Sequence, residues 1–342
     1  MTNHANRIKQ TARDIGFDVV GIARIGPSNS PVPHQSKGTA PQTNFTSDLY
    51  TRLTNWLEAG YHGTMNWMAR SPDRRASPER VLPGCRSMIC VGTNYYTQHD
   101  ADERPGNGRI ARYAWGKDYH RVLDKRLKQL EQAIHLLAND VHTRRYVDTG
   151  PIMEKAWAQQ AGLGWIGKHS NLVSPQFGSW LLLGEILTTL DLDPDEPGTD
   201  LCGTCSLCIK ACPTGAITEP YVVDATKCVS YLTIEYAGNL DSIAQPLRKQ
   251  MGNRIFGCDD CLDICPYNNM ATPSKESAFE PTADTQAPKL LRLLELNEED
   301  FRQTFQGSPI RRAKHDGLRR NVHIALSNSP KQASNPIPTQ PS

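Results

Sequence analysis

Residues 201–217, LCGTCSLCIKACPTGAI, hold four cysteines in the spacing CxxCxxCxxxCP. Bacterial ferredoxins use this spacing to bind [4Fe-4S] clusters: three thiolates hold one cluster, and the fourth, beside the proline, binds a second cluster. A partner half follows in residues 256–268, FGCDDCLDICPYN, which repeats the CxxC and CP spacing with one cysteine fewer. The segment KCVSYL (227–232) can supply that missing ligand.

Two ligand sets result when each set of three thiolates is paired with the CP cysteine of the other half. The first set is Cys202, Cys205, Cys208 and Cys265, and the second is Cys212, Cys228, Cys258 and Cys261. Two zinc knuckles or a set of disulfides are the alternatives, but zinc sites favour two CxxC pairs or histidines, and neither explains the paired CP ends. Because such clusters carry single electrons and do no organic chemistry, this module predicts a relay to an acceptor elsewhere.

The rest of the composition narrows the class of protein. A chain of 342 residues suggests about two to three domains. With 38 basic and 36 acidic side chains, the overall charge carries no signal for nucleic acid or membrane. The N-terminal residues lack an apolar core and a twin arginine, and no stretch approaches eighteen apolar residues, so we expect a cytoplasmic protein that does not bind membranes. Cys85 and Cys90 have no ligand pattern and are predicted to be buried apolar residues.

Before the cysteine module, β-branched runs alternate with helical periods, which predicts a domain of mixed helices and strands. Leucine and isoleucine residues at steps of three and four place one apolar helix face between residues 123 and 137. Two further amphipathic helices are expected in residues 290–305 and 318–329. The predicted strands are DVVGIARI (18–25), SMICVGTNYY (87–96), RRYVDTG (144–150) and GSWLLLGEILTTL (178–190).

Changes of composition predict the domain boundaries. An acidic, proline-containing linker at 191–200 separates a first domain from the cysteine module. Residues 27–47, rich in Pro, Ser, Thr and Gly, are predicted to be a surface insertion. The predicted divisions are 1–190 for the first domain, 191–275 for the two-cluster domain, 276–330 for a short helical region and 331–342 for a disordered tail.

Several long segments resemble the epoxyqueuosine reductase family. They are VDTGPIMEKAWAQQAGLGWIGKHSNLVSPQFGSWLLLGEILT (147–188), the cysteine run 201–217, KCVSYLTIE (227–235) and MGNRIFGCDDCLDICPYN (251–268). The resemblance runs from about Ile8 to Cys265 and continues weakly into LRRNVHIAL (318–326). It implies an α+β protein: a nitroreductase-like cobalamin-binding domain, a two-[4Fe-4S] ferredoxin-like domain and a truncated HEAT-like helical end.

The resemblance also implies an activity, the reduction of epoxyqueuosine to queuosine at the wobble position of tRNA, the last step of queuosine biosynthesis. Converting an epoxide to an alkene takes two electrons and two protons and releases water. Asp148 matches the family's proton-donating aspartate, and an apolar setting over the corrin would raise its pKa. An aspartate that merely opens a turn before Gly150 and Pro151 is the alternative reading of this residue.

By the same resemblance, cobalamin is contacted by residues of both domains, while the string DYHRVL (118–123) lacks the glycine of a DxHxxG motif. A base-off cobalamin without a protein histidine ligand is therefore expected. Electrons are expected to pass from the second cluster through the first to cobalt. WGKDYH (115–120) resembles a family string without a specific role. The implied cobalamin contacts are Arg75, Ala111, Asp148, Leu172, Leu183, Ser230 and Asp259.

The implied partners are a tRNA carrying epoxyqueuosine and an external low-potential donor of the ferredoxin or flavodoxin type, and the protein is expected to be a monomer. Between Arg302 and Arg320, six basic side chains accompany one acidic residue, Asp316, which could hold phosphates. Two other functions remain as alternatives. A reductive dehalogenase has a similar architecture but usually carries an export signal, and a non-catalytic electron-transfer subunit would not need the large first domain.

Overall fold

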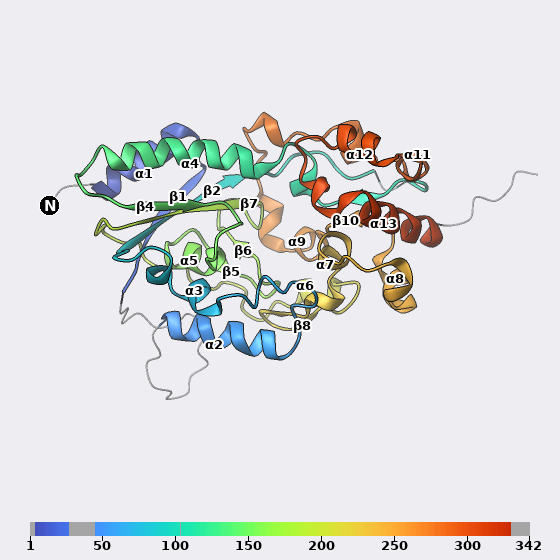
Figure 1. Cartoon of the computed structure of the whole chain (residues 1–342), viewed down its shortest axis with the longest axis horizontal. Helices are drawn as coiled ribbons and strands as arrows, with labels where there is room; N and C mark the ends of the chain where they lie inside the picture. The colour runs from blue at the N-terminus through green and yellow to red at the C-terminus, as the bar shows by residue number, and fades with distance from the viewer. Residues whose placement is uncertain (1–3, 27–44, 103, 330–342) are drawn as a thin grey trace, which may run out of the picture.

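The computed structural model describes residues 4–26, 45–102 and 104–329. A four-stranded antiparallel sheet in the order β1-β2-β7-β4 forms the centre of the N-terminal half (Figure 1). β2 and β7 are long because β-branched and leucine side chains are buried on both faces. The strands are β1 (Val19–Arg24), β2 (Ser87–Asn94), β7 (Leu181–Thr188) and β4 (Thr143–Tyr146).

Helices cover both faces of this sheet. The predicted apolar stripe forms α4 (Tyr119–His135), whose residues Leu123, Leu127, Leu130 and Ile134 are fully buried beside α1 (His4–Ile15). α5 (Glu154–Gln160) packs on the other face, together with α2 (Phe45–Glu58) and α3 (Pro72–Ala76). The four predicted strands and the α4 helix are therefore present. Of the predicted insertion 27–47, residues 27–44 lie outside the described residues.

The second half consists of short elements around the cysteines and a helical end. A parallel pair joins the two halves: β3 (Arg109–Ile110) lies beside β10 (Arg254–Phe256). Other short strand pairs are β5 (Trp165–Ile166) with β6 (Leu172–Val173) and β8 (Ile217–Glu219) with β9 (Val222–Val223). The helices are α6 (Leu207–Ala211), α7 (Val229–Ile234), α8 (Gln245–Met251), α9 (Asp260–Asp263), α10 (Ala283–Gln286), α11 (Leu290–Glu295), α12 (Glu298–Thr304) and α13 (Lys314–Asn328).

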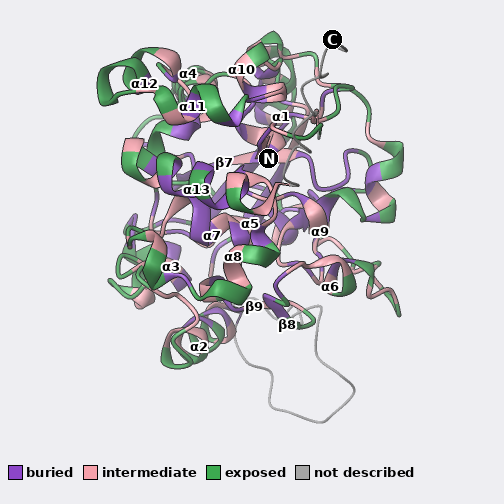
Figure 2. Cartoon of the chain, turned by 90° about the vertical axis from the view of Figure 1, so that its right-hand side faces the viewer, coloured by how far each residue is buried: buried purple, intermediate pink, exposed green. Residues whose placement is uncertain are grey.

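The C-terminal helices pack on the cysteine module. Figure 2 shows α13 with buried residues facing α7, while α12 and α8 expose their outer surfaces. α13 covers β10 and shares one apolar core with β3. The single helix expected in 290–305 is wrong: it is divided into α11 and α12, because the side chain of Asn297 caps the backbone N–H of Asp300 and starts a new helix. The predicted tail 331–342 lies outside the described residues. None of the described helices is long and apolar enough to cross a membrane.

Candidate active site

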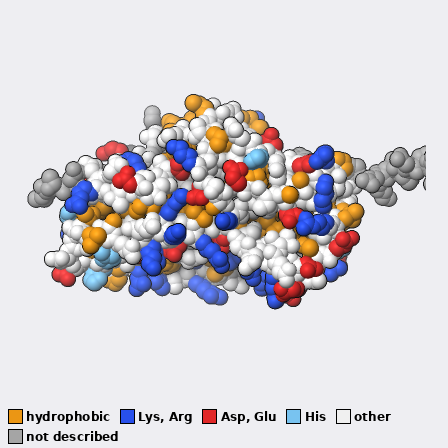
Figure 3. Space-filling view, turned by 90° about the horizontal axis from the view of Figure 1, so that it is seen from above, with side chains coloured by type: hydrophobic (Ala, Val, Ile, Leu, Met, Phe, Trp, Pro, Cys, Tyr) orange, Lys and Arg blue, Asp and Glu red, His pale blue; other side chains and the backbone are white. Residues whose placement is uncertain are grey.

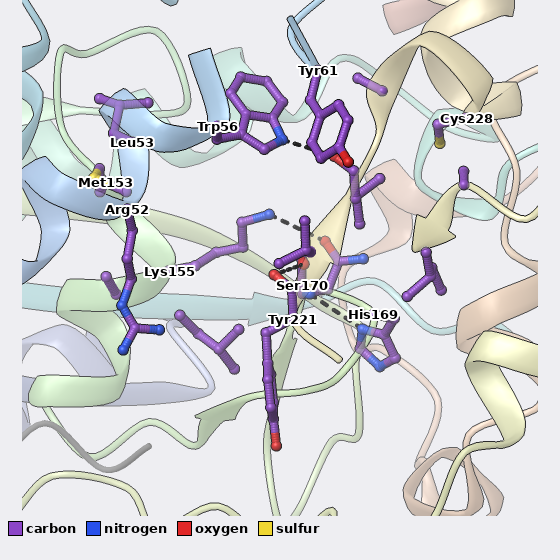
Figure 4. A pocket seen from close by; sticks show the side chains of 18 of the residues that line it. Arg52, Leu53, Trp56, Tyr61, Met153, Lys155, His169, Ser170, Tyr221 and Cys228 are labelled. Carbon is purple, nitrogen blue, oxygen red and sulfur yellow. Dashed lines mark hydrogen bonds between the residues drawn. The ribbon is translucent and has the colours of Figure 1, made fainter. Parts of the chain in front are cut away.

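A cavity of about 1260 Å³ lies between the sheet domain and the cysteine module. Its wall comes from α2, the start of α5, the loop before β6 and the loops that carry four of the cysteines. Figure 4 shows Trp56 and Tyr61 on one side and Lys155, Ser170 and His169 across from them. Trp56 Nε1 donates to the carbonyl of Val223 at 2.7 Å, which ties α2 to the cysteine module. The cavity is thus built by segments far apart in the sequence.

Asp148 lines this cavity, two residues after the end of β4. Its backbone adopts the left-handed conformation, with φ of 60°, which is uncommon for a non-glycine residue. The side chain is 54% exposed, so it is accessible from the cavity. Tyr119 donates its hydroxyl to Asp148 Oδ2 at 3.0 Å, and His120 Nε2 lies 3.4 Å from the same oxygen. The turn is therefore arranged to present a hydrogen-bonded carboxylate.

The Asp148 carboxyl has a lowered pKa, and the upward shift expected with a corrin over it stays a prediction. The hydrogen bond with His120 holds the pKa of this carboxyl below its ordinary value, and this effect outweighs burial, which acts in the opposite direction. Tyr119 and the positive charge of Lys155 lower the pKa further. Asp148 is therefore an anion at neutral pH, and its proton has to come from a neighbour.

His120 is that neighbour, and it lies in the string WGKDYH (115–120), to which no specific role is assigned from the sequence. Its Nδ1 lies 2.7 Å from Oδ1 of Asp118, the residue that caps α4 by accepting from the backbone N–H of His120. Burial alone would lower the pKa of His120, but hydrogen bonds with Asp118 and Asp148 raise it to about 9. The imidazole is consequently protonated at neutral pH and stores a proton beside Asp148.

Two further carboxyl groups interact electrostatically with Asp148. Burial, followed by the negative charge of Asp148, raises the pKa of Glu154 to about 7. Glu185, in β7, is 2% exposed, and neither of its carboxyl oxygens has a hydrogen-bond partner within the described ranges. Burial, followed by the charge of Glu154, raises its pKa well above the ordinary value. Glu185 is therefore a neutral acid under the site.

The eight cysteines of the module fall into two groups of four. Cys208 interacts electrostatically with Cys202, Cys265 and Cys205. In the other group, Cys261 interacts with Cys258, Cys228 and Cys212. This grouping agrees with the two sets that the CP pairing predicts, and their role as cluster ligands stays a prediction. All ten cysteines are free thiols in the structure.

Only the second cysteine group lines the cavity; its members there are Cys212, Cys228, Cys258 and Cys261. The second group therefore lies nearer the cavity, which favours the second cluster as the direct donor to it, whereas the expected order placed the first cluster in that position. The sequence could not show this order because the spacing of the two halves is nearly symmetric.

Donors of the surrounding chain point at the sulfur atoms. Trp165 Nε1 lies 3.4 Å from Cys202 Sγ, and the backbone N–H of Ala216 lies 3.2 Å from Cys212 Sγ. Such N–H···S contacts orient the ligands and tune the reduction potential of a bound cluster. At least one N–H donor serves each group, so both groups are arranged to stabilise thiolates that carry negative charge.

The cobalamin contacts implied by the sequence divide into two sets. Arg75, Asp148 and Ser230 line the cavity. Ala111, Leu172, Leu183 and Asp259 do not lie in its lining, and Asp259 instead accepts from the backbone N–H of Arg112 at 2.6 Å. Sequence reasoning missed Trp67, Lys155 and His169, which do line it.

Comparisons with known proteins agree with this geometry. Residues 75–149 match the family described as "Epoxyqueuosine reductase QueG, DUF1730", and residues 201–268 match "4Fe-4S double cluster binding domain". The second match decides against zinc knuckles. An epoxyqueuosine reductase of Synechocystis sp. is 45% identical over 84% of this chain and 99% of the relative. That of Escherichia coli (strain K12) is 41% identical over 95% of this chain and 81% of the relative.

Solved structures lead to the same family. An epoxyqueuosine reductase crystallised with an epoxyqueuosine-modified tRNA-Tyr stem loop superposes with a TM-score of 0.83 and 29% identity, covering 94% of this chain and 80% of that chain. The Bacillus subtilis enzyme, in a structure with an aspartate-bearing catalytic loop swung out of the active site, gives a TM-score of 0.82 at 28% identity, covering 94% and 81%. These matches confirm the predicted fold class, and the chain belongs to the epoxyqueuosine reductase family.

Proposed function

We propose that this chain reduces the epoxide of epoxyqueuosine at the wobble position of tRNA to queuosine, using cobalamin and two [4Fe-4S] clusters. The observation that carries the proposal is that Asp148 and the second cysteine group line one cavity. A carboxylate that can transfer protons and the ligands of an electron-transferring cluster thus border the same cavity. Membership in the family favours this reaction over reductive dehalogenation and over a purely electron-carrying role.

The cavity fits cobalamin in size and in wall chemistry. Pockets for drug-sized ligands have volumes of about 300–1,000 Å³, and this one is larger. Arg75 lies on its wall, with the guanidinium 5.2 Å from the ring of Trp67. Arg75 Nε is buried without a hydrogen-bond partner among the residues that the structure describes. A bound group with amide oxygens along its edge, as in a corrin, would supply the missing acceptor. Arg75, Ser230 and Trp67 would hold the cofactor.

Each turnover adds two electrons and two protons to the epoxide, leaves an alkene and releases the oxygen as water. Bound cobalamin supplies a strongly reducing metal centre for cleaving the carbon–oxygen bond. Asp148 lines the cavity as an anion, takes a proton from His120 Nε2, 3.4 Å from its Oδ2, and passes it to the departing oxygen. His120 is reprotonated from solvent, and a second transfer by the same route completes the water molecule. Asp118 stabilises the imidazolium, so the proton remains available at neutral pH.

The tRNA contact is proposed at the C-terminal side of the cavity mouth. Arg312, which is paired with Glu235, also interacts electrostatically with Asp148. Arg311 and Lys314 lie beside it in the chain and are exposed. Figure 3 shows Lys and Arg side chains gathered along the lower edge of the face that it views. Arg320, which the sequence grouped with these residues, is unavailable to phosphate because it is buried and donates to the carbonyls of Leu232, Tyr236 and Gly238.

We also propose that the enzyme works in the cytoplasm as a monomer, and that a ferredoxin or flavodoxin supplies its electrons. The sequence-implied ligand sets are retained: Cys202, Cys205, Cys208 and Cys265 for the first cluster, and Cys212, Cys228, Cys258 and Cys261 for the second. The grouping of the sulfur atoms supports both sets.

The test is anaerobic reconstitution with iron, sulfide and cobalamin, followed by mass spectrometry of nucleosides from epoxyqueuosine-containing tRNA. Asp148→Asn should lower turnover by at least about 10²-fold, as expected when a general acid is lost. Asp140→Asn is a matched control because Asp140 also has a left-handed backbone, with φ of 57°, and does not line the cavity. Full turnover without cobalamin, or with Asp148→Asn, would refute the proposal.

A further inference from the structure

Three large apolar side chains are exposed around the first cysteine group. Leu201 is 50% exposed, Leu207 44% and Ile264 43%. Each directly precedes a cysteine of that group, namely Cys202, Cys208 and Cys265. Exposing such side chains next to the cluster ligands costs solvation free energy, and clustered exposed apolar residues mark interaction sites more often than isolated ones do.

The three residues lie on elements that pack together. Leu207 begins α6 and Ile264 follows α9, and these helices are in contact (Figure 2). Tyr267 donates its hydroxyl to the carbonyl of Leu201 at 3.1 Å, and its ring lies 4.7 Å from the ring of Trp165. The apolar residues therefore form one face over the first cysteine group, which we call the Leu207 face: Leu201, Leu207 and Ile264.

Lysines border this face. Lys168 Nζ donates to the carbonyls of Gly203 and Cys205, at 2.6 and 2.8 Å, so its positive charge is held at the cysteine loop. Lys210 is exposed on α6, one turn after Leu207. The nearby Asp263 is paired with Arg109, and Asp200, which precedes Leu201, accepts from the hydroxyl of Tyr221 and the backbone N–H of Cys202. An apolar centre with lysines at its rim is complementary to an acidic partner.

The position of the face relative to the cavity assigns its partner. The second cysteine group lines the cavity and the first does not, so the first group is where electrons enter from outside. We propose that the Leu207 face docks a small acidic electron-transfer protein, which passes electrons to the first cluster. Weak redox complexes bury less than about 1,200 Å², a size that suits a face with three apolar residues.

This inference rests on the proposed function, because it needs two clusters that feed the cavity. In each encounter the carrier is oxidised by one electron and the first cluster is reduced by one. Two encounters supply the two electrons that one epoxide consumes.

The experiment uses holoenzyme loaded with clusters and cobalamin, and fully reduced flavodoxin as the probe. Leu207→Glu places a negative charge in the face, and Lys210→Glu removes a positive charge from its rim. Leu136→Glu is the matched control. Leu136 is 87% exposed at the end of α4, in the sheet domain and outside the cysteine module. Stopped-flow absorbance measures cluster reduction, and NMR shifts of labelled oxidised flavodoxin measure binding.

We expect Leu207→Glu and Lys210→Glu each to lower the second-order rate of reduction by flavodoxin about ten-fold, and to weaken flavodoxin binding in parallel. Reduction by dithionite and turnover with dithionite should stay at the wild-type value, as should both readouts for Leu136→Glu. Iron content shows whether Leu207→Glu has lost its clusters. If it has, the flavodoxin kinetics and binding of Lys210→Glu test the docking face alone. Unchanged flavodoxin kinetics and binding in Lys210→Glu would overturn the docking face. Absence of dithionite-driven turnover in wild-type holoenzyme would instead refute the proposed function.

Discussion

His120 Nε2 lies 3.4 Å from Oδ2 of Asp148, and this pair places a protonated imidazole behind an accessible carboxylate. The pKa of His120 is raised to about 9, because hydrogen bonds with Asp118 and Asp148 outweigh the effect of burial. The pair is therefore loaded with a proton at neutral pH and loses it as the pH rises past the pKa of His120.

The pH profile of turnover should follow this pair. Wild-type kcat/KM for epoxyqueuosine tRNA should fall on a basic limb near the pKa of His120, about 9. Asp118→Asn removes one anionic partner, so the pKa of His120 drops and the basic limb moves to lower pH. His120→Gln should lower kcat by about 10²-fold and abolish that limb. An unshifted limb in Asp118→Asn would show that another group controls it.

Glu185 should titrate in the unfolded chain and not in the folded protein. The folded protein keeps a proton that an unfolded carboxyl group releases above a pKa of about 4.3, so the contribution of Glu185 to the free energy of unfolding falls as pH rises above that value. Glu185→Gln has no such titration and should gain stability relative to the wild type between about pH 5 and about pH 8. Urea denaturation across this range measures the difference. A constant difference would mean that Glu185 is ionised in the folded state.

Gly178 is predicted to tolerate no side chain. Its φ is +57°, and an added Cβ would lie 1.9 Å from Asn268 Oδ1, which accepts from the backbone N–H of Ser179. Gly178→Ala should reduce the free energy of unfolding by at least about 2 kcal/mol. It should also reduce iron uptake, because Asn268 follows Cys265 in the CP loop. Gly307→Ala, at φ of +71° with nothing within 4 Å of the added atom, should cost about 1 kcal/mol and leave iron content unchanged.

Trp165→Phe tests the donor at the first cysteine group. A hydrogen bond to sulfur favours the reduced, more negative cluster, so losing the Nε1 donor 3.4 Å from Cys202 should lower the potential of the first cluster. The second cluster, which has its own donor at Ala216, should keep its potential. Redox titration followed by electron paramagnetic resonance separates the two signals. A shift confined to the second cluster would contradict the assignment of ligands.

The sequence predicted the elements with strong local patterns and the ligands with fixed spacing. The cysteine sets and the apolar face of α4 need only residues close in the chain. The Asp148 turn was identified by resemblance, but its electrostatics were not, because Tyr119 and His120 reach it from the start of α4, a distant segment. Arg112 shows the same limit: it packs against the rings of Tyr96, Trp115 and Trp180 and donates to the carbonyl of Thr97, a burial that no local pattern reveals.

The pairing of β3 with β10 affects how this protein can be made. β3 obtains its parallel neighbour only after the ribosome has synthesised most of the chain, since Arg109 aligns with Arg254. A fragment that stops before the cysteine module would leave that strand edge open to aggregation. A chimaera joined at the acidic linker would take β3 from one relative and β10 from another, so their pairing would not be native. Both strands should therefore come from the same parent protein.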